Sequence, residues 1–283
     1  MPALSLFSSR LRRFALTLAL AGTGIAGTAL DLTSATIPEL NAAFASGRLT
    51  SEQLTAMYLR RIAAYDQQGP EINAVIALHP DALATARALD AERRRQGPRG
   101  PLHGIPVVLK DNFDTADLPT TAGCQVLRGS IPPDDACLVR RLRAAGAVIL
   151  AKVNLSELAS DGGAPPGYSS MGGQTRNPHD PARSPSGSSG GTGAAVAAAF
   201  AQLGLGSDTS SSVRAPCSVN GIAGLRPTLG LLSRDGIVPL SLSFDTAGPM
   251  ARSVTDIAVV LGVLTGVDPA DPATAASAGR HET

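Results

Sequence analysis

Residues 201–217 read AQLGLGSDTSSSVRAPC, an apolar segment that runs into three consecutive serines. The first part, AQLGLGSD, has the character of a short buried strand, and the turn that follows begins with Thr209. Proteins of the α/β class place active sites at strand ends of this kind. Successive backbone N–H groups in such a turn can also point at a developing oxyanion. Ser210, Ser211 and Ser212 therefore form either a catalytic turn or a flexible serine linker.

Apolar segments alternate with amphipathic ones along the rest of the chain, which predicts an α/β fold. The runs INAVIAL (72–78), IPVVLK (105–110) and AVILAK (147–152) are predicted to be strands. Because helices separate these strands, we expect a mostly parallel or mixed β-sheet flanked by helices. Capping-box patterns at Thr36 and Thr50 mark the first two helix starts. Further helices are predicted over residues 81–95, 135–145, 154–160, 193–203 and 253–266.

The composition is that of a globular domain with a sizeable core. Of the 283 residues, 43% are hydrophobic and 17% are charged, which excludes an intrinsically disordered chain. A net charge of +1 and an aromatic content of 3% argue against nucleic-acid binding. The three cysteines are too irregularly spaced for a disulfide framework or a zinc site, so we expect small buried side chains and at most one disulfide. No linker divides residues 31–283, which we interpret as one domain.

The N-terminal segment, residues 1–30, has the organisation of a secretory signal peptide. Arg10, Arg12 and Arg13 precede an apolar run over residues 14–30 that has small residues near its end. The run is short for a membrane span and contains three glycines. We therefore predict an exported protein, periplasmic or secreted, without stable membrane insertion after signal cleavage. The alternative is an uncleaved membrane anchor.

A glycine-rich turn, SPSGSSGGTG, occupies residues 184–193 at the end of a long loop that begins at Asp161. Phosphate binding is one interpretation, but the turn lacks the lysine of a nucleotide-binding P-loop. A second interpretation is a nucleophile elbow, with Ser189 at the centre of G-x-S-x-G. An elbow must follow a strand directly, whereas three prolines precede this turn, and only His281 lies later in the chain as a triad histidine. The context therefore argues against the elbow.

Lys110 closes the apolar run over residues 105–110 and is followed by Asp111 and Asn112. A lysine at the mouth of a buried strand loses hydration, which lowers its pKa and permits a neutral amine near neutral pH. Such an amine can serve as the general base for a serine nucleophile. The alternative is an ordinary strand-end lysine that is paired with Asp111.

Three segments carry a family resemblance: GIPVVLKDN (104–112), RSPSGSSGG (183–191) and GSDTSSSVRAPCSVNGIAGLRPT (206–228). Together they resemble the amidase signature family, and the resemblance extends from about Ile37 to the C-terminus. The segment GLLSRDGIVPLSLSFDTAGPMARSVTDIA (230–258) is most similar to the peptide amidase branch, which hydrolyses the C-terminal carboxamide of peptides. The resemblance implies a mixed-sheet α/β core flanked by helices. It also implies acyl transfer from a small-molecule or peptide amide, with no metal or cofactor required.

Carried over by position, the Ser–cis-Ser–Lys triad of the family falls on Ser212, Ser188 and Lys110. The resemblance implies that Ser212 is the acylating nucleophile. It also implies that Ser188 follows a cis peptide bond and passes protons between Ser212 and Lys110. Ser189 becomes a supporting hydroxyl. The implied oxyanion hole consists of the backbone N–H groups of Thr209, Ser210, Ser211 and Ser212.

Two features depart from the family pattern. Family members usually carry glycine immediately before the nucleophile, where this chain has Ser210 and Ser211. If position 211 requires a positive φ, a side chain there costs about 1–2 kcal/mol. Family members are also much longer than this chain. We therefore expect that the C-terminal part of the family domain is missing and that apolar sheet surface is exposed.

Three interpretations of function remain open. The chain is an exported serine amidase for peptide amides, an amidase for aryl, fatty or cyclic amides, or a truncated and inactive remnant. The protein that supplies ammonia for tRNA-linked amidation shares these motifs, but an export signal does not fit its role. The sequence makes no prediction of the oligomeric state.

Overall fold

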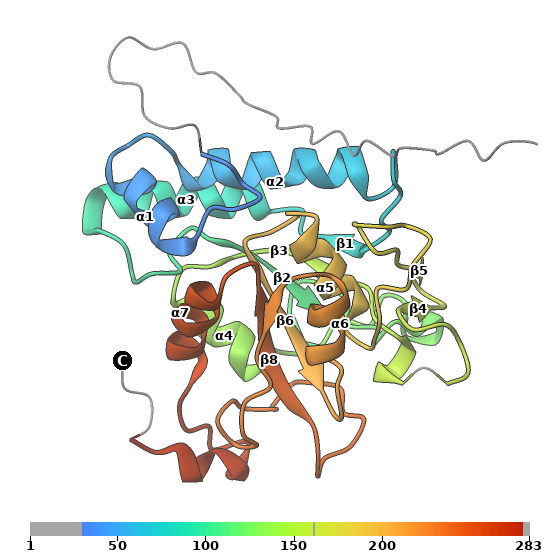
Figure 1. Ribbon diagram of the computed structural model, residues 1–283. Coiled ribbons are helices and arrows are strands. Elements are labelled where there is room, and N and C mark those ends of the chain that lie inside the picture. The colour runs from blue at the N-terminus through green and yellow to red at the C-terminus, as the bar shows by residue number, and fades with distance from the viewer. Residues whose placement is uncertain (1–29, 161, 280–283) are drawn as a thin grey trace, which may run out of the picture.

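The computed structural model describes residues 30–160 and 162–279. At its centre is a six-stranded sheet with the strand order β1-β3-β2-β6-β8-β7, and β4 and β5 form a separate hairpin (Figure 1). The predicted signal peptide, residues 1–30, lies outside the described residues except for Leu30. The strands are β1 (Val75–Leu78), β2 (Pro106–Lys110), β3 (Val148–Val153), β4 (Tyr168–Ser169), β5 (Gly173–Gln174), β6 (Leu203–Asp208), β7 (Ala223–Gly224) and β8 (Thr246–Ala251).

The sheet is mixed. Strand β2 pairs in parallel with β3 on one side and with β6 on the other. Strands β1, β8 and β7 join antiparallel to β3, β6 and β8 respectively. The three central strands are buried along their whole length, as their nearly continuous apolar sequences predict. The prediction of an α/β fold with a mixed sheet is therefore confirmed.

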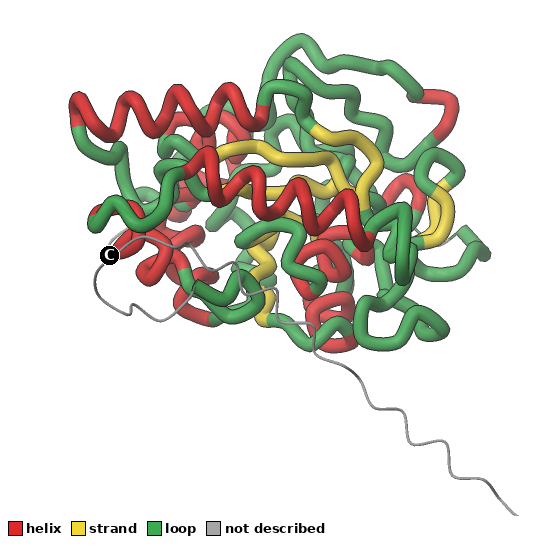
Figure 2. The backbone as a smooth tube through the Cα atoms, turned by 90° about the horizontal axis from the view of Figure 1, so that it is seen from above, coloured by secondary structure: helices red, strands yellow, loops and turns green. Residues whose placement is uncertain are grey.

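Helices lie on both faces of the sheet (Figure 1). Helix α5 packs against β2, β3 and β6 and also contacts α6, whereas α4 and α7 contact each other on the opposite side. Helices α2 and α3 contact each other and lie over the strands, as Figure 2 shows from above. Within the described ranges, no helix combines the length and apolarity needed to cross a bilayer. The helices are α1 (Ile37–Ala45), α2 (Ser51–Tyr65), α3 (Ala82–Gln96), α4 (Cys137–Ala144), α5 (Gly190–Ala197), α6 (Arg214–Val219) and α7 (Val254–Leu264), with 3-10 turns η1 (Gln125–Leu127), η2 (Glu157–Ala159) and η3 (Pro272–Ser277).

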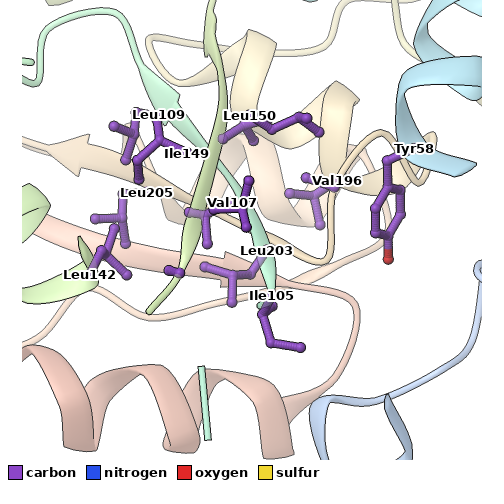
Figure 3. Packing of buried hydrophobic residues seen from close by; sticks show 14 of the residues in the cluster. Tyr58, Ile105, Val107, Leu109, Leu142, Ile149, Leu150, Val196, Leu203 and Leu205 are labelled. Atoms are coloured by element: carbon purple, nitrogen blue, oxygen red, sulfur yellow. The ribbon is translucent and has the colours of Figure 1, made fainter. Parts of the chain in front are cut away.

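Aliphatic side chains of the central strands form the core (Figure 3). Leu109 of β2 and Leu205 of β6 are fully buried, together with Leu142 of α4. Tyr58 of α2 reaches the same core, where its hydroxyl satisfies its hydrogen-bonding requirement by donating to Gln202 Oε1 at 2.7 Å. This packing holds the ends of β2 and β6 side by side. Those ends carry Lys110 and the serine turn.

Both predicted capping boxes are present. The Thr36 side chain accepts from the backbone N–H of Glu39, whose carboxylate accepts from the Thr36 N–H at 2.8 Å. Thr50 and Gln53 form the same reciprocal pair at the start of α2. Local sequence was sufficient here because both partners lie within one helical turn.

The predicted helix over 154–160 is wrong. Only the 3-10 turn η2 forms there, and Leu158 within it has a φ of 53°. The physical reason is tertiary: the Asn154 side chain donates to Gly173 O at 2.9 Å, and its backbone carbonyl accepts from Gly191 at 3.0 Å. These contacts draw the segment away from helical geometry. The long loop before the glycine-rich turn, which has no predicted strand, contains the β4–β5 hairpin.

The cysteines are free, so no disulfide forms. Cys137 and Cys217 are buried as expected, whereas Cys124 is only half-buried and the expectation is wrong for it. Burial raises the pKa of the Cys217 thiol to about 12. A thiol of this kind is not a nucleophile near neutral pH.

Candidate active site

Lys110 is the last residue of β2, and its side chain is fully buried. Its Nζ donates to Ser188 Oγ at 2.6 Å and to Ser207 Oγ at 2.9 Å. Asp111 has another partner, because its carboxylate forms an ion pair with Lys152 at 3.0 Å. Consecutive strand residues point to opposite faces of a sheet, so the side chains of Lys110 and Asp111 diverge. The arrangement favours a buried, hydroxyl-bonded lysine over an ordinary strand-end lysine.

Ser188 stands just before α5, and only 3% of its surface is exposed. The Gly187–Ser188 peptide bond is cis, as the resemblance implied. The Ser188 carbonyl accepts from the backbone N–H of Ser156 at 2.9 Å, which attaches it to the segment that follows β3. This anchoring aims the hydroxyl at Lys110, which lies 78 positions earlier in the sequence.

The glycines of this turn allow the close approach of two backbone segments. A Cβ placed on Gly191 would lie 2.2 Å from the Asn154 carbonyl oxygen, so a side chain cannot be accommodated there. The Gly191 N–H donates to that oxygen at 3.0 Å. The glycine-rich turn therefore packs the start of α5 against the end of β3.

Ser189 does not stand in a nucleophile elbow. No strand of the described residues ends immediately before it, because β5 ends at Gln174. The side chain is fully buried, and its hydroxyl donates to Ser207 O at 3.1 Å. This contact agrees with a supporting role for the hydroxyl.

Ser212 lies at the edge of the buried cluster, with 9% of its surface exposed. Its carbonyl accepts from the Ser189 N–H at 3.2 Å, which joins the serine turn to the start of α5. In residues 30–160 and 162–279, no group forms a hydrogen bond with the Ser212 hydroxyl, and none links it to Ser188. The structure thus brings the two segments together and leaves the Ser212 hydroxyl available. The catalytic roles stay predictions.

The turn from Thr209 to Ser212 exposes backbone donors. In the described part of the chain, none of its four N–H groups donates to a protein acceptor. The buried Asp208 carboxylate closes the turn by accepting from the Val213 N–H at 3.0 Å. Backbone N–H groups that have no protein acceptor and lie beside a serine hydroxyl are the donors that an oxyanion hole would use.

The serines that replace the usual glycine do not strain the backbone. The residues with positive φ in the described ranges include neither Ser210 nor Ser211. Both side chains are exposed to solvent. The cost of about 1–2 kcal/mol for a side chain at positive φ therefore does not apply to this turn.

One polar partner of Lys110 was not identified from the sequence. Ser207 Oγ accepts from Lys110 and also from Asn112 Nδ2 at 3.0 Å. Ser207 belongs to β6, whose parallel register with β2 places Leu205 opposite Leu109. The sequence shows that Ser207 is a hydroxyl residue near the end of an apolar strand. That it contacts Lys110 follows only from the register between β6 and β2.

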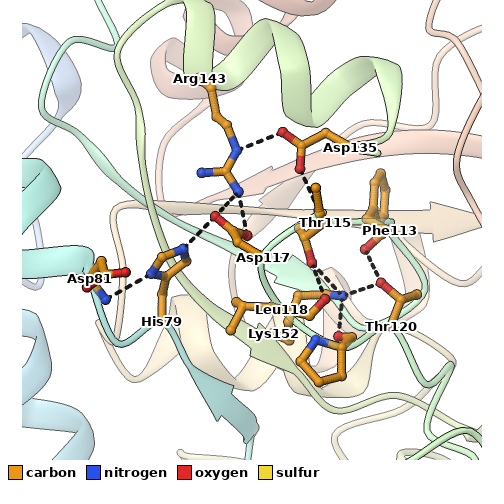
Figure 4. Close-up of polar contacts among 12 residues, drawn as sticks. His79, Asp81, Phe113, Thr115, Asp117, Leu118, Thr120, Asp135, Arg143 and Lys152 are labelled. Carbon is orange, nitrogen blue, oxygen red and sulfur yellow. Dashed lines mark hydrogen bonds and ion pairs between the residues drawn. The ribbon is translucent and has the colours of Figure 1, made fainter. Parts of the chain in front are cut away.

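A second buried lysine lies close to the first. Lys152 of β3 is fully buried, and its Nζ forms an ion pair with Asp111 and donates to Pro119 O at 3.0 Å. Its Nζ also donates to Thr120 Oγ1 at 2.9 Å (Figure 4). Burial lowers the pKa of Lys152 despite the ion pair. The chain has no other lysine than Lys110 and Lys152, so its remaining basic side chains, histidines aside, are arginines.

A small cavity of about 30 Å³ adjoins Ser207, the hydroxyl partner of Lys110. Ser207, Leu242 and Asp245 are among the residues that line it, and Arg234 forms part of the wall. Arg234 is held by Asp271 through two ion-pair contacts of 2.6 and 2.9 Å. In the described residues, no group of three or more His, Cys, Asp or Glu side chains could hold a metal ion.

The ion pair between Asp271 and Arg234 makes the free energy of unfolding depend on pH in the acidic range. The hydrogen bonds from Arg234 hold the pKa of Asp271 below 3.8, so the pair stabilises the fold fully above about pH 3.8 and less as the pH falls through the lowered value. We expect Asp271→Asn to lower the free energy of unfolding at pH 7 by about 1.5–3 kcal/mol. Urea unfolding between about pH 2 and pH 7 should show a shallower acid limb for the variant. An unchanged acid limb would contradict the assignment.

Comparison with known proteins finds relatives over most of the chain. A family model described as Amidase matches residues 53–282. The A-subunit of glutamyl-tRNA(Gln) amidotransferase from Acidothermus cellulolyticus is 46% identical over 242 residues, which cover 85% of this chain and 47% of that protein. The structure of native peptide amidase from Stenotrophomonas maltophilia matches with a TM-score of 0.85 and 53% identity, over 87% of this chain and 51% of that one. A peptide amidase in complex with the competitive inhibitor chymostatin gives 52% identity and the same TM-score and coverage.

The chain therefore spans about half the length of the relatives it matches. Over that half, the similarity to peptide amidase structures includes both sequence and fold. The relatives carry names of two kinds, since one is a glutamyl-tRNA(Gln) amidotransferase subunit and the other is a peptide amidase.

Proposed function

This chain belongs to the amidase signature family, and on that premise we propose that it is a serine amidase. It hydrolyses carboxamide bonds through an acyl-enzyme formed on Ser212. The observation that supports this most directly is the fully buried contact of 2.6 Å between Lys110 Nζ and Ser188 Oγ. That contact lies beside Ser212, whose carbonyl is hydrogen-bonded to the residue after Ser188. A buried lysine in contact with serine hydroxyls is an arrangement that active sites use to activate a nucleophile.

In the first half of the proposed cycle, the Ser212 oxygen attacks the amide carbonyl carbon. Ser188 takes the proton of Ser212 and passes its own to a neutral Lys110. The backbone N–H groups of Thr209 to Ser212 stabilise the negative charge that develops on the carbonyl oxygen. The C–N bond then breaks, and the same relay returns the proton to the departing ammonia or amine.

In the second half, water attacks the ester carbon of the acyl-enzyme. The relay takes a proton from the water and returns it to Ser212 as the C–O bond breaks, which releases the carboxylic acid. Every proton that leaves one group is received by another, so the cycle restores Ser212, Ser188 and Lys110.

We propose peptide C-terminal amides as the substrate class. The identity of 52–53% to peptide amidase structures supports this assignment. Other linear amides, whether aryl or fatty, and cyclic amides are the alternatives within the family. The 46% identity to part of a tRNA-dependent amidotransferase supports a different role, which we disfavour because residues 1–30 have the pattern of an export signal. We accordingly propose a periplasmic or secreted location.

The proposal is tested with the full chain and a panel of amides. Ammonia release is measured from a peptide amide, free glutamine and an aryl amide, and the reactive serine is located by fluorophosphonate labelling followed by peptide mapping. We expect turnover of the peptide amide and labelling at Ser212. Labelling at Ser189 would instead support the elbow, and a folded chain that neither reacts nor releases ammonia would support the inactive remnant.

A further inference from the structure

Asp245 is a buried carboxylate that connects the serine turn to a neighbouring loop. It is 8% exposed and directly precedes β8. Its Oδ1 accepts from the Thr209 hydroxyl at 2.5 Å. Its Oδ2 accepts from the backbone N–H groups of Leu240 at 2.8 Å and Ser241 at 2.9 Å. The two oxygens therefore divide their donors between the turn and the loop.

The position of this contact follows from the strand register. Strands β6 and β8 pair antiparallel, and their last pair joins Asp208 to Thr246. Thr209 and Asp245 are the next residues in each direction, so they face each other one step beyond the backbone ladder. Their side-chain hydrogen bond continues the strand pairing into the turn.

The local hydrogen bonds of the turn hold its carbonyls, because Ser211 O accepts from the Ala215 N–H at 2.8 Å and Ser210 O accepts from the Arg214 guanidinium. The N–H groups of Thr209 to Ser212 form no hydrogen bonds to protein acceptors in the described ranges. At its C-terminal end, the turn is held by Asp208, which accepts from Val213, and by the Ser189 N–H, which donates to Ser212 O. At the N-terminal end of the turn, the Thr209 hydroxyl donates to Asp245, and this hydrogen bond restrains the Thr209 side chain.

We propose that Asp245 is a positioning residue, which holds the N–H groups of the Thr209–Ser212 turn in the orientation that stabilises the oxyanion. The inference rests on the proposed serine amidase function. Oxyanion donors act only when they are held close to the position of the developing charge. Asp245 does not touch the substrate in this role; it acts through Thr209. The same carboxylate sets the loop from Leu240 to Phe244, whose Leu242 lines the cavity beside Ser207.

The test compares Asp245→Asn, Thr209→Val and the double variant in the full chain. Thr209→Val removes the hydroxyl donor, and Asp245→Asn leaves one acceptor oxygen that cannot serve both Thr209 and the N–H groups of Leu240 and Ser241. We expect kcat to fall by about 10- to 100-fold in both, with KM changed by less than about threefold. Because both variants weaken the same contact, the double variant should be no more than about threefold slower than the slower single variant. Thr209→Ser keeps the hydroxyl and should recover most of the kcat that Thr209→Val loses.

Asp90→Asn is the matched control. Asp90 is also a buried carboxylate, 6% exposed, and accepts from two consecutive backbone N–H groups, Ser51 at 2.8 Å and Glu52 at 2.9 Å. It caps α2 and has no contact with the serine turn. We expect its removal to lower Tm without changing kcat by more than about twofold. An equal loss of kcat in Asp90→Asn and Asp245→Asn, or additive losses in the double variant, would overturn the positioning role.

Hydrogen exchange separates this inference from the proposed function. The Ser189 N–H donates to Ser212 O at the C-terminal end of the turn, and the Val213 N–H donates to Asp208, which precedes the turn. The exchange rates of these two amides therefore measure how well the turn is ordered, and the measurement needs no substrate. We expect both to exchange faster in Asp245→Asn and Thr209→Val than in Asp90→Asn. If the parent chain releases no ammonia, the proposed function fails, and the exchange rates still decide whether Asp245 holds the turn. Unchanged exchange in both variants would reject the inference.

Discussion

Ser212→Ala should abolish amide hydrolysis while the protein remains folded. Loss of a serine nucleophile from a triad typically lowers kcat by about 10⁴-fold or more, and the remaining rate comes from the oxyanion donors and substrate binding. The effect on stability should be small, because no hydrogen bond of the described residues involves the Ser212 hydroxyl. Ammonia release and fluorophosphonate labelling should disappear together, and the midpoint of thermal unfolding should change little.

Ser189→Ala is the control for this experiment. Ser189 follows Ser188 in the chain and adjoins the same cluster, and its hydroxyl donates to Ser207 O. Its loss removes one buried hydrogen bond, which costs about 1 kcal/mol of stability, and leaves the triad intact. Hydrolysis that survives in Ser212→Ala and vanishes in Ser189→Ala would reverse the assignment of the nucleophile.

Lys152→Met should cause the largest loss of stability among the variants considered. Lys152 and Asp111 are both fully buried and form an ion pair at 3.0 Å. Removing one member of such a pair leaves the other charge buried without compensation, which typically costs about 3–5 kcal/mol. Urea or thermal unfolding measures this loss directly. Activity should fall mainly through the smaller folded fraction.

The double variant Lys152→Met with Asp111→Asn is the matched control, because it removes the uncompensated charge. We expect it to recover part of the free energy of unfolding that Lys152→Met loses. A double variant that is less stable than Lys152→Met would contradict the explanation by charge burial.

The ionisation of Lys152 can be followed separately, since a sample labelled at lysine contains only Lys110 and Lys152. Burial lowers the pKa of Lys152 below 10.5, so between the lowered value and 10.5 the unfolded chain binds the extra proton. The contribution of Lys152 to the free energy of unfolding therefore rises with pH across that window. An NMR titration that assigns Lys152 a pKa at or above 10.5 would contradict this direction.

Much of the fold could be predicted from the sequence because its signals are local. The apolar runs before Lys110 and around Leu205 mark buried strands, and Thr36 and Thr50 begin helices through partners within one turn. The helix predicted over 154–160 failed for the opposite reason. Asn154 uses its side chain and its carbonyl to bind segments that lie far away in the sequence, and no local pattern reports those contacts.

The candidate site was predicted from its motifs, and the structure adds the groups that surround them. Lys110 and Ser188 meet at 2.6 Å as the resemblance implied, whereas Ser207 and Asp245 were not identified. Ser207 reaches Lys110 only because β6 lies parallel to β2, and Asp245 reaches Thr209 only because β8 is antiparallel to β6. Strand register is a property of the folded chain, so these contacts have no signature in the sequence around them.

The sequence by itself determined where the strands end and which polar residues follow them, because side-chain periodicity and turn composition are local properties. It therefore placed Lys110 and the run Thr209–Ser212 at strand ends. Only the tertiary structure decided which of these groups meet. The alternation of side chains at the end of β2 sends Lys110, its last residue, towards Ser188 and the next residue, Asp111, towards Lys152. The fold thereby directs Lys110 to serine hydroxyls and Asp111 to Lys152, although Lys110 and Asp111 are neighbours in the chain.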